Sequence, residues 1–336
     1  MNALGEWAGK SYDDCMNTPI VIAIPGDDPP QLQASPHLER LRSRGDVVLH
    51  LDRPADDAEK LRRVAGATCL VNSRSAVKWP GHLLRQLPAL RMITVCGIGT
   101  DSIDTATARE LGIAVCNVPG QTAPIVAEHA LALMLATARR VVYQTEQLRK
   151  GIWKTPDNIY LAGKTLGVLG AGSIGAAMIR LGKAIGMRVQ AWSFHPSADR
   201  ERELGVPFVE RDELLLTSDV VSIHVKLTEQ TRGMIGTREL ALMKPGSILV
   251  NTARGAIVDT AALVQSLHAG HLGGAGIDVF DTEPLPADHP LLSCEQVVLT
   301  PHVADQNPEG MEILNRGAVD NVLAFLDGKT INRVNI

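Results

Sequence analysis

Three side chains that can carry out acid–base and anion-binding chemistry each follow an apolar run in the second half of the chain. Arg254 follows GSILVNTA, Glu283 follows GAGIDVFDT and His302 follows QVVLTP. Alone, each has a simpler interpretation, as a turn residue, a solvated loop acid or a loop histidine. Together they meet the needs of hydride transfer between a nicotinamide and a 2-keto acid: a cation for the carboxylate, a proton donor, and a group that keeps this donor protonated. We therefore predict that the three residues are catalytic.

The apolar runs before these residues are typical of parallel strands. A series of short β-rich runs separated by helical patterns begins at KTLGVLG and continues through MRVQAW, DVVSIHV, GSILVNTA, GGAGIDVF and QVVLTP. This alternation predicts a doubly wound sheet, and ligands bind such sheets at the carboxyl ends of the strands. We expect Arg254, Glu283 and His302 to lie at that edge.

A glycine-rich turn opens this series, because Gly170, Gly172 and Gly175 have GxGxxG spacing between a predicted strand and a predicted helix. Gly170 allows a tight turn, Gly172 lets the backbone approach a pyrophosphate, and Gly175 lets the helix pack on the strand. The first N–H groups of the helix, around Ser173 and Ile174, are free to bind an anion. Within a complete βαβ unit, the turn predicts dinucleotide binding rather than mere packing.

The acid that usually binds the adenosine ribose, about 20 residues further on, is missing. Ser193 lies 18 residues after Gly175 and His195 lies 20 residues after it. The absence of a carboxylate removes a barrier against the 2′-phosphate of NADP. The candidate cations for that phosphate are His195, Arg200 and Arg202, which are equally well interpreted as solvated loop charges. We predict NAD as the cofactor, with Ser193 bonding the ribose and with weak discrimination against NADP.

The first part of the chain shows a second alternating series. Its β-rich runs are TPIVIAI, DVVLHL, ATCLVNS and LRMITVC. A long uninterrupted helical pattern then runs over 123–150 and stops at Gly151, and we interpret it as the connector between two lobes. The tail after residue 307 is again helical. The predicted fold class is α/β, with two doubly wound lobes.

Composition narrows the function classes. The chain has 336 residues, 45% of them hydrophobic and 21% charged, with a formal charge of −4, and no basic run marks a nucleic-acid or membrane partner. The N-terminus lacks a signal pattern and no apolar run is long enough to span a bilayer. We expect no disulfide framework, no metal site and a reducing, cytoplasmic location, because the cysteines are dispersed and lack CxxC spacing: Cys15, Cys69, Cys96, Cys116 and Cys294.

Several motifs in order resemble one family. GIGTDSID, VAEHALALMLATAR, GAGSIG, NTARGAIVD, GIDVFDTEP and LTPHVA are similar to segments of the D-isomer-specific 2-hydroxyacid dehydrogenases, from about residue 65 onward. The resemblance implies an NAD(P)-dependent oxidoreductase with a Rossmann dinucleotide-binding domain (123–301) inserted into a flavodoxin-like substrate-binding domain (1–122 and 302–336). It also implies a homodimer formed through the cofactor domain and its long helix, which suits the apolar residues 127–138.

The resemblance also implies roles by position. Arg254 resembles the family's substrate-binding arginine, His302 its acid/base, and Glu283 the carboxylate that pairs with the histidine. Further substrate contacts are implied in the first lobe, at Gly97 in VCGIG and at Arg74 in NSRS. The positions that resemble cofactor contacts are His224, Thr231, Thr252, Ala253 and Asp278.

Three positions depart from the family pattern. Ser193 replaces the usual ribose acid. Lys226 stands in HVKLT where proline is frequent, so the loop on the adenine side could differ. Asp305 stands where the family often has glycine, so a carboxylate near the nicotinamide could reshape the pocket.

Two other functions stay open at the level of the sequence. An NAD(H)-sensing, corepressor-like binding protein would keep the fold without turnover. A 3-phosphoglycerate dehydrogenase-like enzyme would keep the same triad. Few basic residues mark the first-lobe loops, so we favour a small unphosphorylated 2-keto or 2-hydroxy acid such as glyoxylate or hydroxypyruvate.

Overall fold

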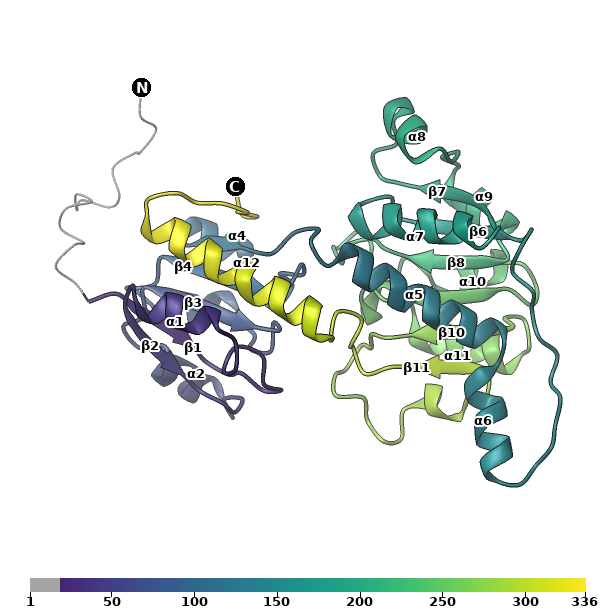
Figure 1. Cartoon of the computed structure of the whole chain (residues 1–336), viewed down its shortest axis with the longest axis horizontal. Coiled ribbons are helices and arrows are strands. Elements are labelled where there is room, and N and C mark those ends of the chain that lie inside the picture. Colours follow the sequence, from purple (N-terminus) through teal and green to yellow (C-terminus); the bar gives the residue numbers. More distant parts are fainter. Residues whose placement is uncertain (1–18) are drawn as a thin grey trace. The chain divides into compact units, whose positions relative to one another are not determined.

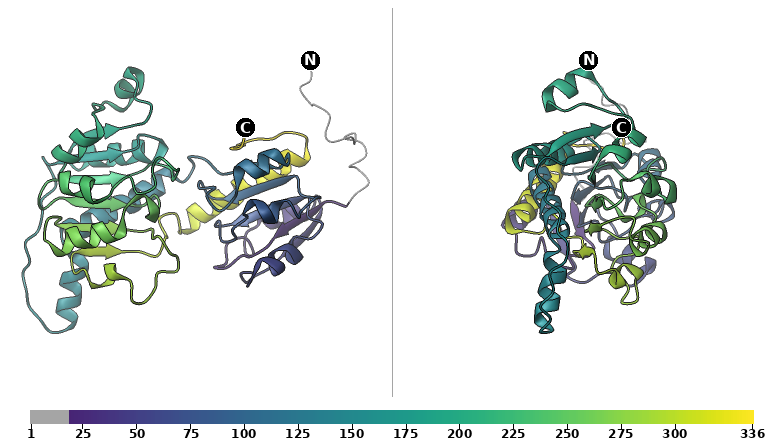
Figure 2. Two further views of the ribbon diagram at one scale, coloured as in Figure 1. Left: turned by 180° about the vertical axis from the view of Figure 1, so that it is seen from behind. Right: turned by 90° about the vertical axis from the view of Figure 1, so that its right-hand side faces the viewer.

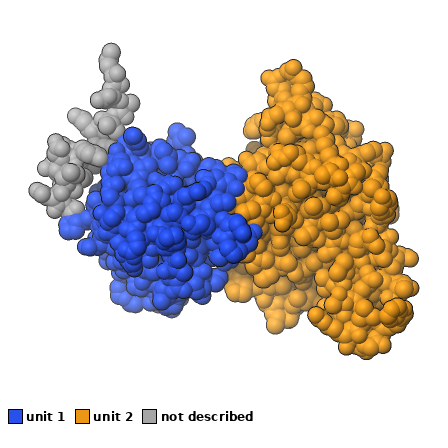
Figure 3. All heavy atoms as spheres, viewed as in Figure 1, with its two compact units in different colours: residues 1–121, 307–336 blue, residues 122–306 orange. Residues whose placement is uncertain are grey.

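The computed structural model describes residues 19–336, which form two compact units (Figure 3). The first unit extends to Gln121 and resumes from Asn307 to Ile336, and the second comprises Thr122–Gln306. The sequence-based boundary stood at residue 302, whereas the structure keeps His302 in the second unit. The part of the predicted first domain before residue 19, including Cys15, lies outside the described residues. The substrate and cofactor roles of the two domains stay predictions.

Five parallel strands form the sheet of the first unit, in the order β2-β1-β3-β4-β5. They are β1 (Val21–Ile24), β2 (Asp46–Leu49), β3 (Cys69–Ser73), β4 (Met92–Cys96) and β5 (Ala114–Cys116). The helices of this unit are α1 (His37–Arg42), α2 (Asp57–Arg63), α3 (Gly81–Leu84), α4 (Thr105–Glu110) and α12 (Pro308–Leu326).

Both faces of this sheet are buried, as its continuous apolar strands require. Alternate residues of β1 enter different cores: Ile22 and Ile24 pack with α1 and α12, while Ala23 packs with α2, α3 and α4. Helix α12 contributes Leu314, Ala318, Val319 and Val322 to the first of these cores. The C-terminal helix therefore completes a sheet built from the N-terminal part of the chain (Figure 1).

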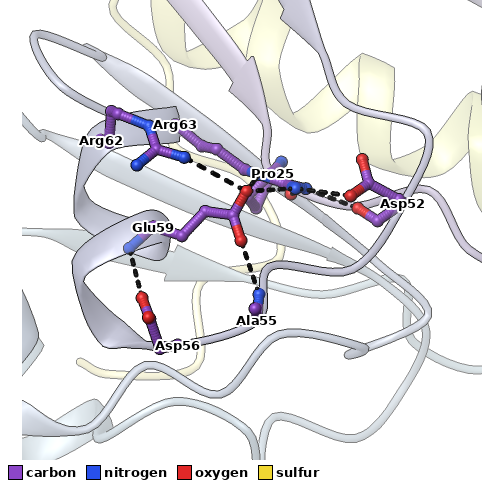
Figure 4. A network of polar contacts seen from close by, with 7 residues as sticks. All are labelled: Pro25, Asp52, Ala55, Asp56, Glu59, Arg62 and Arg63. Atoms are coloured by element: carbon purple, nitrogen blue, oxygen red, sulfur yellow. Dashed lines mark hydrogen bonds and ion pairs between the residues drawn. The ribbon is translucent and has the colours of Figure 1, made fainter.

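Two buried charged side chains fasten the carboxyl edge of the first sheet. The guanidinium of Arg63 is bonded to the carbonyl oxygens of Pro25 and Asp52, at 2.9 and 2.6 Å, and to the carboxylates of Asp52 and Glu59 (Figure 4). This network ties the loops after β1 and β2 to helix α2.

Asp27, which is fully buried, is the second of these side chains. It accepts the Ser73 hydroxyl at 2.7 Å and the backbone N–H groups of residues 31–33 at 2.9–3.1 Å. The carboxylate thus folds its own following loop back onto the end of β3.

Six parallel strands form the sheet of the second unit, in the order β11-β10-β9-β8-β6-β7. They are β6 (Thr165–Leu169), β7 (Arg188–Trp192), β8 (Val220–Ile223), β9 (Ile248–Asn251), β10 (Gly274–Ile277) and β11 (Val297–Leu299). The helices are α5 (Ala123–Ala138), α6 (Val141–Arg149), α7 (Ser173–Ala184), α8 (Ala198–Leu204), α9 (Arg211–Thr217), α10 (Thr237–Leu242) and α11 (Thr260–His268), with 3₁₀ turns η2 (Gly255–Ile257) and η3 (Pro290–Ser293).

Helices α5 and α7 cover one face of this sheet, and α9, α10 and α11 cover the other (Figures 1 and 2). The predicted fold class, two doubly wound α/β lobes, is confirmed.

The prediction of one uninterrupted helix over 123–150 is wrong. Arg140 adopts a left-handed conformation (φ 49°) between α5 and α6. Helix α5 packs on β10, and Thr137 lies against Gly274, the first residue of that strand. Because β10 begins at Gly274, residues of the helix beyond Thr137 no longer pack on this strand. The side-chain amide of Gln144 donates to the carbonyl oxygen of Arg139 at 2.6 Å, where the helix ends.

Candidate active site

His302 and Glu283 form a direct pair in the second unit. His302 Nδ1 lies 2.7 Å from Glu283 Oε2, and the other Glu283 oxygen accepts the Phe280 N–H at 3.0 Å. Burial alone would raise the pKa of Glu283, but the hydrogen bond and charge of His302 outweigh it, and the pKa lies below the ordinary value. Because an ionised carboxylate only accepts, Nδ1 carries a proton and Nε2 is left for another partner.

Asp278 holds the loop that carries His302. It is fully buried immediately after β10, and its carboxylate accepts the Thr300 hydroxyl at 2.6 Å and the N–H groups of Val303 and Ala304 at 2.9 and 3.1 Å. Its carbonyl oxygen accepts the N–H of His302 at 2.7 Å. The loop can therefore keep His302 in a left-handed conformation, with φ 54°. The sequence implied Asp278 only as a cofactor contact.

Arg254 lies in a turn whose next residue, Gly255, has no room for a side chain. Asn251, the last residue of β9, donates its side-chain amide to the Arg254 carbonyl at 2.9 Å. A Cβ on Gly255 would collide with the backbone of Phe280, in the segment that leads to Glu283. The positive charge of Arg254 contributes to lowering the pKa of Glu283. The structure thus brings all three predicted catalytic residues to one edge of the second sheet.

The glycine-rich turn has the form that a dinucleotide requires. Gly170 has φ +102°, and a Cβ there would lie 2.8 Å from the His224 backbone, while a Cβ on Gly175 would collide with the Gly170 carbonyl. By contrast, a Cβ on Gly172 would meet nothing within 4 Å. Helix α7 begins at Ser173 with no side-chain cap on its N–H groups. The turn is therefore closely packed at Gly170 and Gly175 and open at Gly172, where a pyrophosphate would approach the backbone.

One further predicted position at this sheet edge, Thr252, fits a polar ligand. The hydroxyl of Thr252 is buried without a hydrogen-bond partner, immediately after β9. A buried hydroxyl of this kind calls for a partner, and a bound cofactor would supply one. The neighbouring Ala253 donates its N–H to Asn251 at 3.0 Å, which fixes the backbone of the turn.

The segment after β7 places Ser193 beside a cavity lined by two aromatic rings and by the polar side chains of Glu210, Arg211, Asp212 and Gln230. Trp192 and Phe194 meet edge to face, with ring centroids 4.6 Å apart, and line a cavity of about 420 Å³. Ser193 accepts the N–H of His195 at 3.2 Å. Arg200 donates to the carbonyl of Ala171, inside the glycine-rich turn, at 3.0 Å. Arg200 is therefore not a free loop charge, and it also pairs with Glu203 at 2.7 Å. Arg202 pairs with Asp199, likewise within helix α8.

The loop after β8 carries the remaining predicted cofactor positions. Burial lowers the pKa of His224 to about 4, and its Nε2 lies 2.8 Å from the Ser222 hydroxyl, so the ring is neutral. Thr231 is almost fully buried, and its hydroxyl donates to the Lys226 carbonyl at 2.6 Å. Thr231 therefore closes the loop from within, while Lys226 is exposed.

The predicted substrate contacts Arg74 and Gly97 lie in the first unit, after the neighbouring strands β3 and β4. Arg74 and Ser75 are both left-handed, with φ 52° and 53°. A Cβ on Gly97 would meet only Val95, at 3.7 Å. The structure brings these two positions to one edge of the first sheet. In the second unit, Asp305 accepts the Gln306 side chain at 3.0 Å.

Other sequence-based expectations concern metals, cysteines and membranes. Within residues 19–336, no group of three or more His, Cys, Asp or Glu side chains is arranged to hold a metal ion. Over the same range, no helix combines the length and apolar character needed to cross a membrane. The four described cysteines are buried free thiols. The predicted cytoplasmic location stays a prediction.

The fold and this site are those of a nucleotide-dependent dehydrogenase, and comparison with known proteins specifies the family. Residues 131–304 match the model of the D-isomer specific 2-hydroxyacid dehydrogenase, NAD binding domain. The chain is 44% identical over 256 residues to a glyoxylate reductase of Aeropyrum pernix, covering 74% of this chain and 76% of that one.

Solved structures agree. A Thermus thermophilus protein is 38% identical, with a TM-score of 0.82 and coverage of 94% of this chain and all of that one. An NADPH-dependent glyoxylate/hydroxypyruvate reductase from Sinorhizobium meliloti, solved with NADP and malonate, is 30% identical, with a TM-score of 0.81 and coverage of 94% and 97%. The chain belongs to the D-isomer specific 2-hydroxyacid dehydrogenase family and is an NAD(P)-dependent oxidoreductase. The predicted family and enzyme class are confirmed.

Proposed function

We propose that this dehydrogenase reduces glyoxylate and hydroxypyruvate, and that Arg254, Glu283 and His302 perform the reaction. The observation that carries the proposal is the 2.7 Å pair between His302 and Glu283 beside the positive charge of Arg254. Relatives that resemble the chain along most of its length carry these two activities in their names.

The balance of charge in the first unit favours an unphosphorylated substrate. The segments after β3 and β4, SRSAVKWP and GIGTDSID, carry Arg74 and Lys78 against Asp101 and Asp104. Their formal charges cancel, which suits a substrate with one carboxylate better than one that also carries a phosphate.

The chemistry follows from the protonation of the pair. Proton donation needs the imidazolium form of His302, in which both ring nitrogens carry protons and which the ionised Glu283 stabilises. Nδ1–H stays bonded to Glu283, and Nε2 gives its proton to the substrate oxygen as the carbonyl becomes a hydroxyl, which leaves His302 neutral. Arg254 pairs with the substrate carboxylate, for which a guanidinium offers two parallel donors. A bound nicotinamide supplies the hydride. The residues that would hold the cofactor are Gly170, Gly172, Ser173, Ile174, Gly175, Ser193, His224, Thr252 and Ala253.

Removal of the proton donor tests this assignment. We expect His302→Ala to lower kcat/KM for glyoxylate by about 10²–10⁴-fold, the usual contribution of a general acid. The control is His82→Ala, which changes an exposed histidine of the first unit and should leave activity unchanged. Near-normal turnover by His302→Ala, on glyoxylate and hydroxypyruvate alike, would show that another group donates the proton.

The enzyme should also accept both cofactors. Ser193 puts no carboxylate against a 2′-phosphate. Arg200 bonds the glycine-rich turn and pairs with the exposed Glu203, and a phosphate can take the place of that surface carboxylate, because a nearby arginine can accommodate it. We expect the KM values for NADH and NADPH to differ by less than about a hundredfold, or 2.7 kcal/mol. Ser193→Asp should raise the KM for NADPH, and Arg200→Gln should do so without changing the KM for NADH. A preference for NADH above a hundredfold in the wild type contradicts this.

The homodimer implied by the sequence is also part of the proposal, but with a different surface: most of the apolar side chains of residues 127–138 are buried in the core of their own unit. The segment from α6 to residue 160 exposes large apolar side chains on the second unit, among them Leu148, Trp153 and Tyr160, of which Trp153 is 86% exposed. Isolated apolar residues on a surface are ordinary, but a run of this size favours a protein contact. Light scattering should give twice the mass of the chain, and Trp153→Ser together with Leu148→Ser should shift it toward the monomer; a monomeric wild type would refute the dimer.

A further inference from the structure

The long helix α5 is fixed on strand β10 by two glycines. A Cβ on Gly274 would lie 2.6 Å from the Thr137 side chain, and one on Gly276 would lie 2.9 Å from Leu133. Four helical residues advance about 6 Å, and two strand residues advance about 6.6 Å. A step of four residues toward the N-terminus of α5 therefore matches a step of two residues toward the C-terminus of β10. The same step places His129 against Asp278.

The contacts of His129 follow this register. Its Nε2 lies 3.0 Å from the Thr300 hydroxyl and 3.4 Å from Asp278 Oδ1. Thr300 gives its single hydroxyl proton to Asp278, at 2.6 Å. The Thr300 oxygen must then accept from His129, so Nε2 of His129 carries a proton. His129, Thr300 and Asp278 form a chain of donors that ends on the buried carboxylate.

The series of hydrogen bonds from His129 ends at Asp278, which also holds the loop that carries His302. Asp278 receives the N–H groups of Val303 and Ala304 on its carboxylate and that of His302 on its carbonyl. A carboxylate with no exposed surface is stable only when its oxygens are satisfied. His129 donates to the Thr300 hydroxyl, which in turn donates to the carboxylate, and its Nε2 lies 3.4 Å from that carboxylate. It comes from a different element than the loop.

We infer that His129 is a positioning residue, which orients the loop of His302 through Thr300 and Asp278. The inference rests on the proposed role of His302 as proton donor. His129 itself touches neither reacting atom. It acts on turnover because an error of about 1 Å in the placement of a reacting group can cost a hundredfold in rate. Helix α5 thereby belongs to the catalytic support as well as to the core.

Two pairs of variants test this inference in the full-length enzyme. His129→Leu removes the donor, whereas His129→Gln keeps an N–H donor at similar reach. Thr300→Val removes the hydroxyl, whereas Thr300→Ser keeps it. The control for a purely structural histidine is His271→Leu, because the ring of His271 bonds the carbonyl oxygens of Leu240 and Met243, away from the loop of His302. The measurements are kcat and KM for glyoxylate, the Kd for NADH by fluorescence, and Tm.

We expect His129→Leu and Thr300→Val to lower kcat by about tenfold to a hundredfold with the Kd for NADH nearly unchanged. His129→Gln and Thr300→Ser should recover most of kcat. His271→Leu should lower Tm without lowering kcat. If His129→Leu does not fold, the threonine pair and His129→Gln decide alone.

A kcat for His129→Leu within twofold of the wild type overturns the inference, as does an equal loss in His129→Leu and His129→Gln. These results, obtained while His302→Ala is inactive, would leave the proposed function standing. Full activity of His302→Ala would instead overturn the proposed function, and with it the role of His129.

Discussion

Two buried aspartates organise the carboxyl edges of the two sheets, and they do so in different ways. Asp27 follows β1 and accepts a hydroxyl from Ser73 at the end of the neighbouring strand β3. Asp278 follows β10 and accepts a hydroxyl from Thr300, just after the neighbouring strand β11. Asp27, however, binds the N–H groups of its own following loop, whereas Asp278 binds those of its neighbour's loop.

The difference shows how one local device serves two purposes. A carboxylate that bonds its own loop closes a turn, and the result is mainly stability. A carboxylate that bonds another strand's loop fixes one functional segment against another, here His302 against the strand that leads to Glu283. The second arrangement also recruits His129 from α5. Stability and catalysis should therefore respond differently when the two aspartates are changed.

Neutralising each aspartate gives the largest expected contrast. Asp278→Asn should lower kcat/KM by about a hundredfold, because the loop of His302 shifts. Asp27→Asn should cost stability, on the scale of about 1.5–3 kcal/mol for a hydrogen bond to a charged group, with a much smaller effect on kcat. Steady-state kinetics and urea unfolding measure the two effects. Equal losses of kcat/KM in both variants would break the comparison.

A smaller contrast concerns the glycines at the two edges. Gly255→Ala puts a Cβ into the Phe280 backbone, and overpacking of this kind costs about 1–3 kcal/mol, so Tm should fall by several degrees. Gly97→Ala meets only Val95 at 3.7 Å and should leave Tm unchanged. Thermal unfolding of the two variants checks this. A stable Gly255→Ala would mean that the Arg254 turn is looser than the structure shows.

The smallest expected effect is the acid dependence of Glu283, a half-exposed counterpart of the two buried aspartates. Its pKa is lower when folded, so its contribution to stability is present above the ordinary glutamate pKa of about 4.3 and is lost as the pH falls through the lowered value. For a half-exposed pair this is about 1 kcal/mol or less. The Tm of Glu283→Gln should lie below that of the wild type at pH 7 and approach it at acid pH. A difference that grows on acidification would show the opposite sign of shift.

Much of the fold could be predicted from the sequence, and so could the sheet edge that carries the three candidate catalytic residues, because these features are local. The spacing of Gly170, Gly172 and Gly175 is enough to predict a turn. The apolar run before His302 predicts that this histidine follows the end of a strand. The boundary between α5 and α6 was missed, because it depends on where β10 begins rather than on the residues near Arg140.

His129 and Gly255 were also missed, for a related reason. Each acts on a segment far along the chain, His129 on Thr300 and Gly255 on Phe280. A signal for His129 does exist in the sequence. Gly274 and Gly276 precede Asp278 at intervals of two residues, the period of a strand. Leu133 and Thr137 follow His129 at intervals of four residues, close to one helical turn. The two patterns can be related only once the helix is known to pack on that strand.

The dependence of the first sheet on helix α12 has a consequence for biosynthesis. Residues 122–306 hold all the strands of the second sheet in one continuous stretch, whereas the core around Ile22 lacks Leu314 and Ala318 until the last part of the chain is made. Domains fold as units during synthesis, usually from the N-terminus. In this protein we expect the inserted unit to fold first on the ribosome. The N-terminal part of the first unit should complete its fold only after the C-terminal helix α12 has been synthesised.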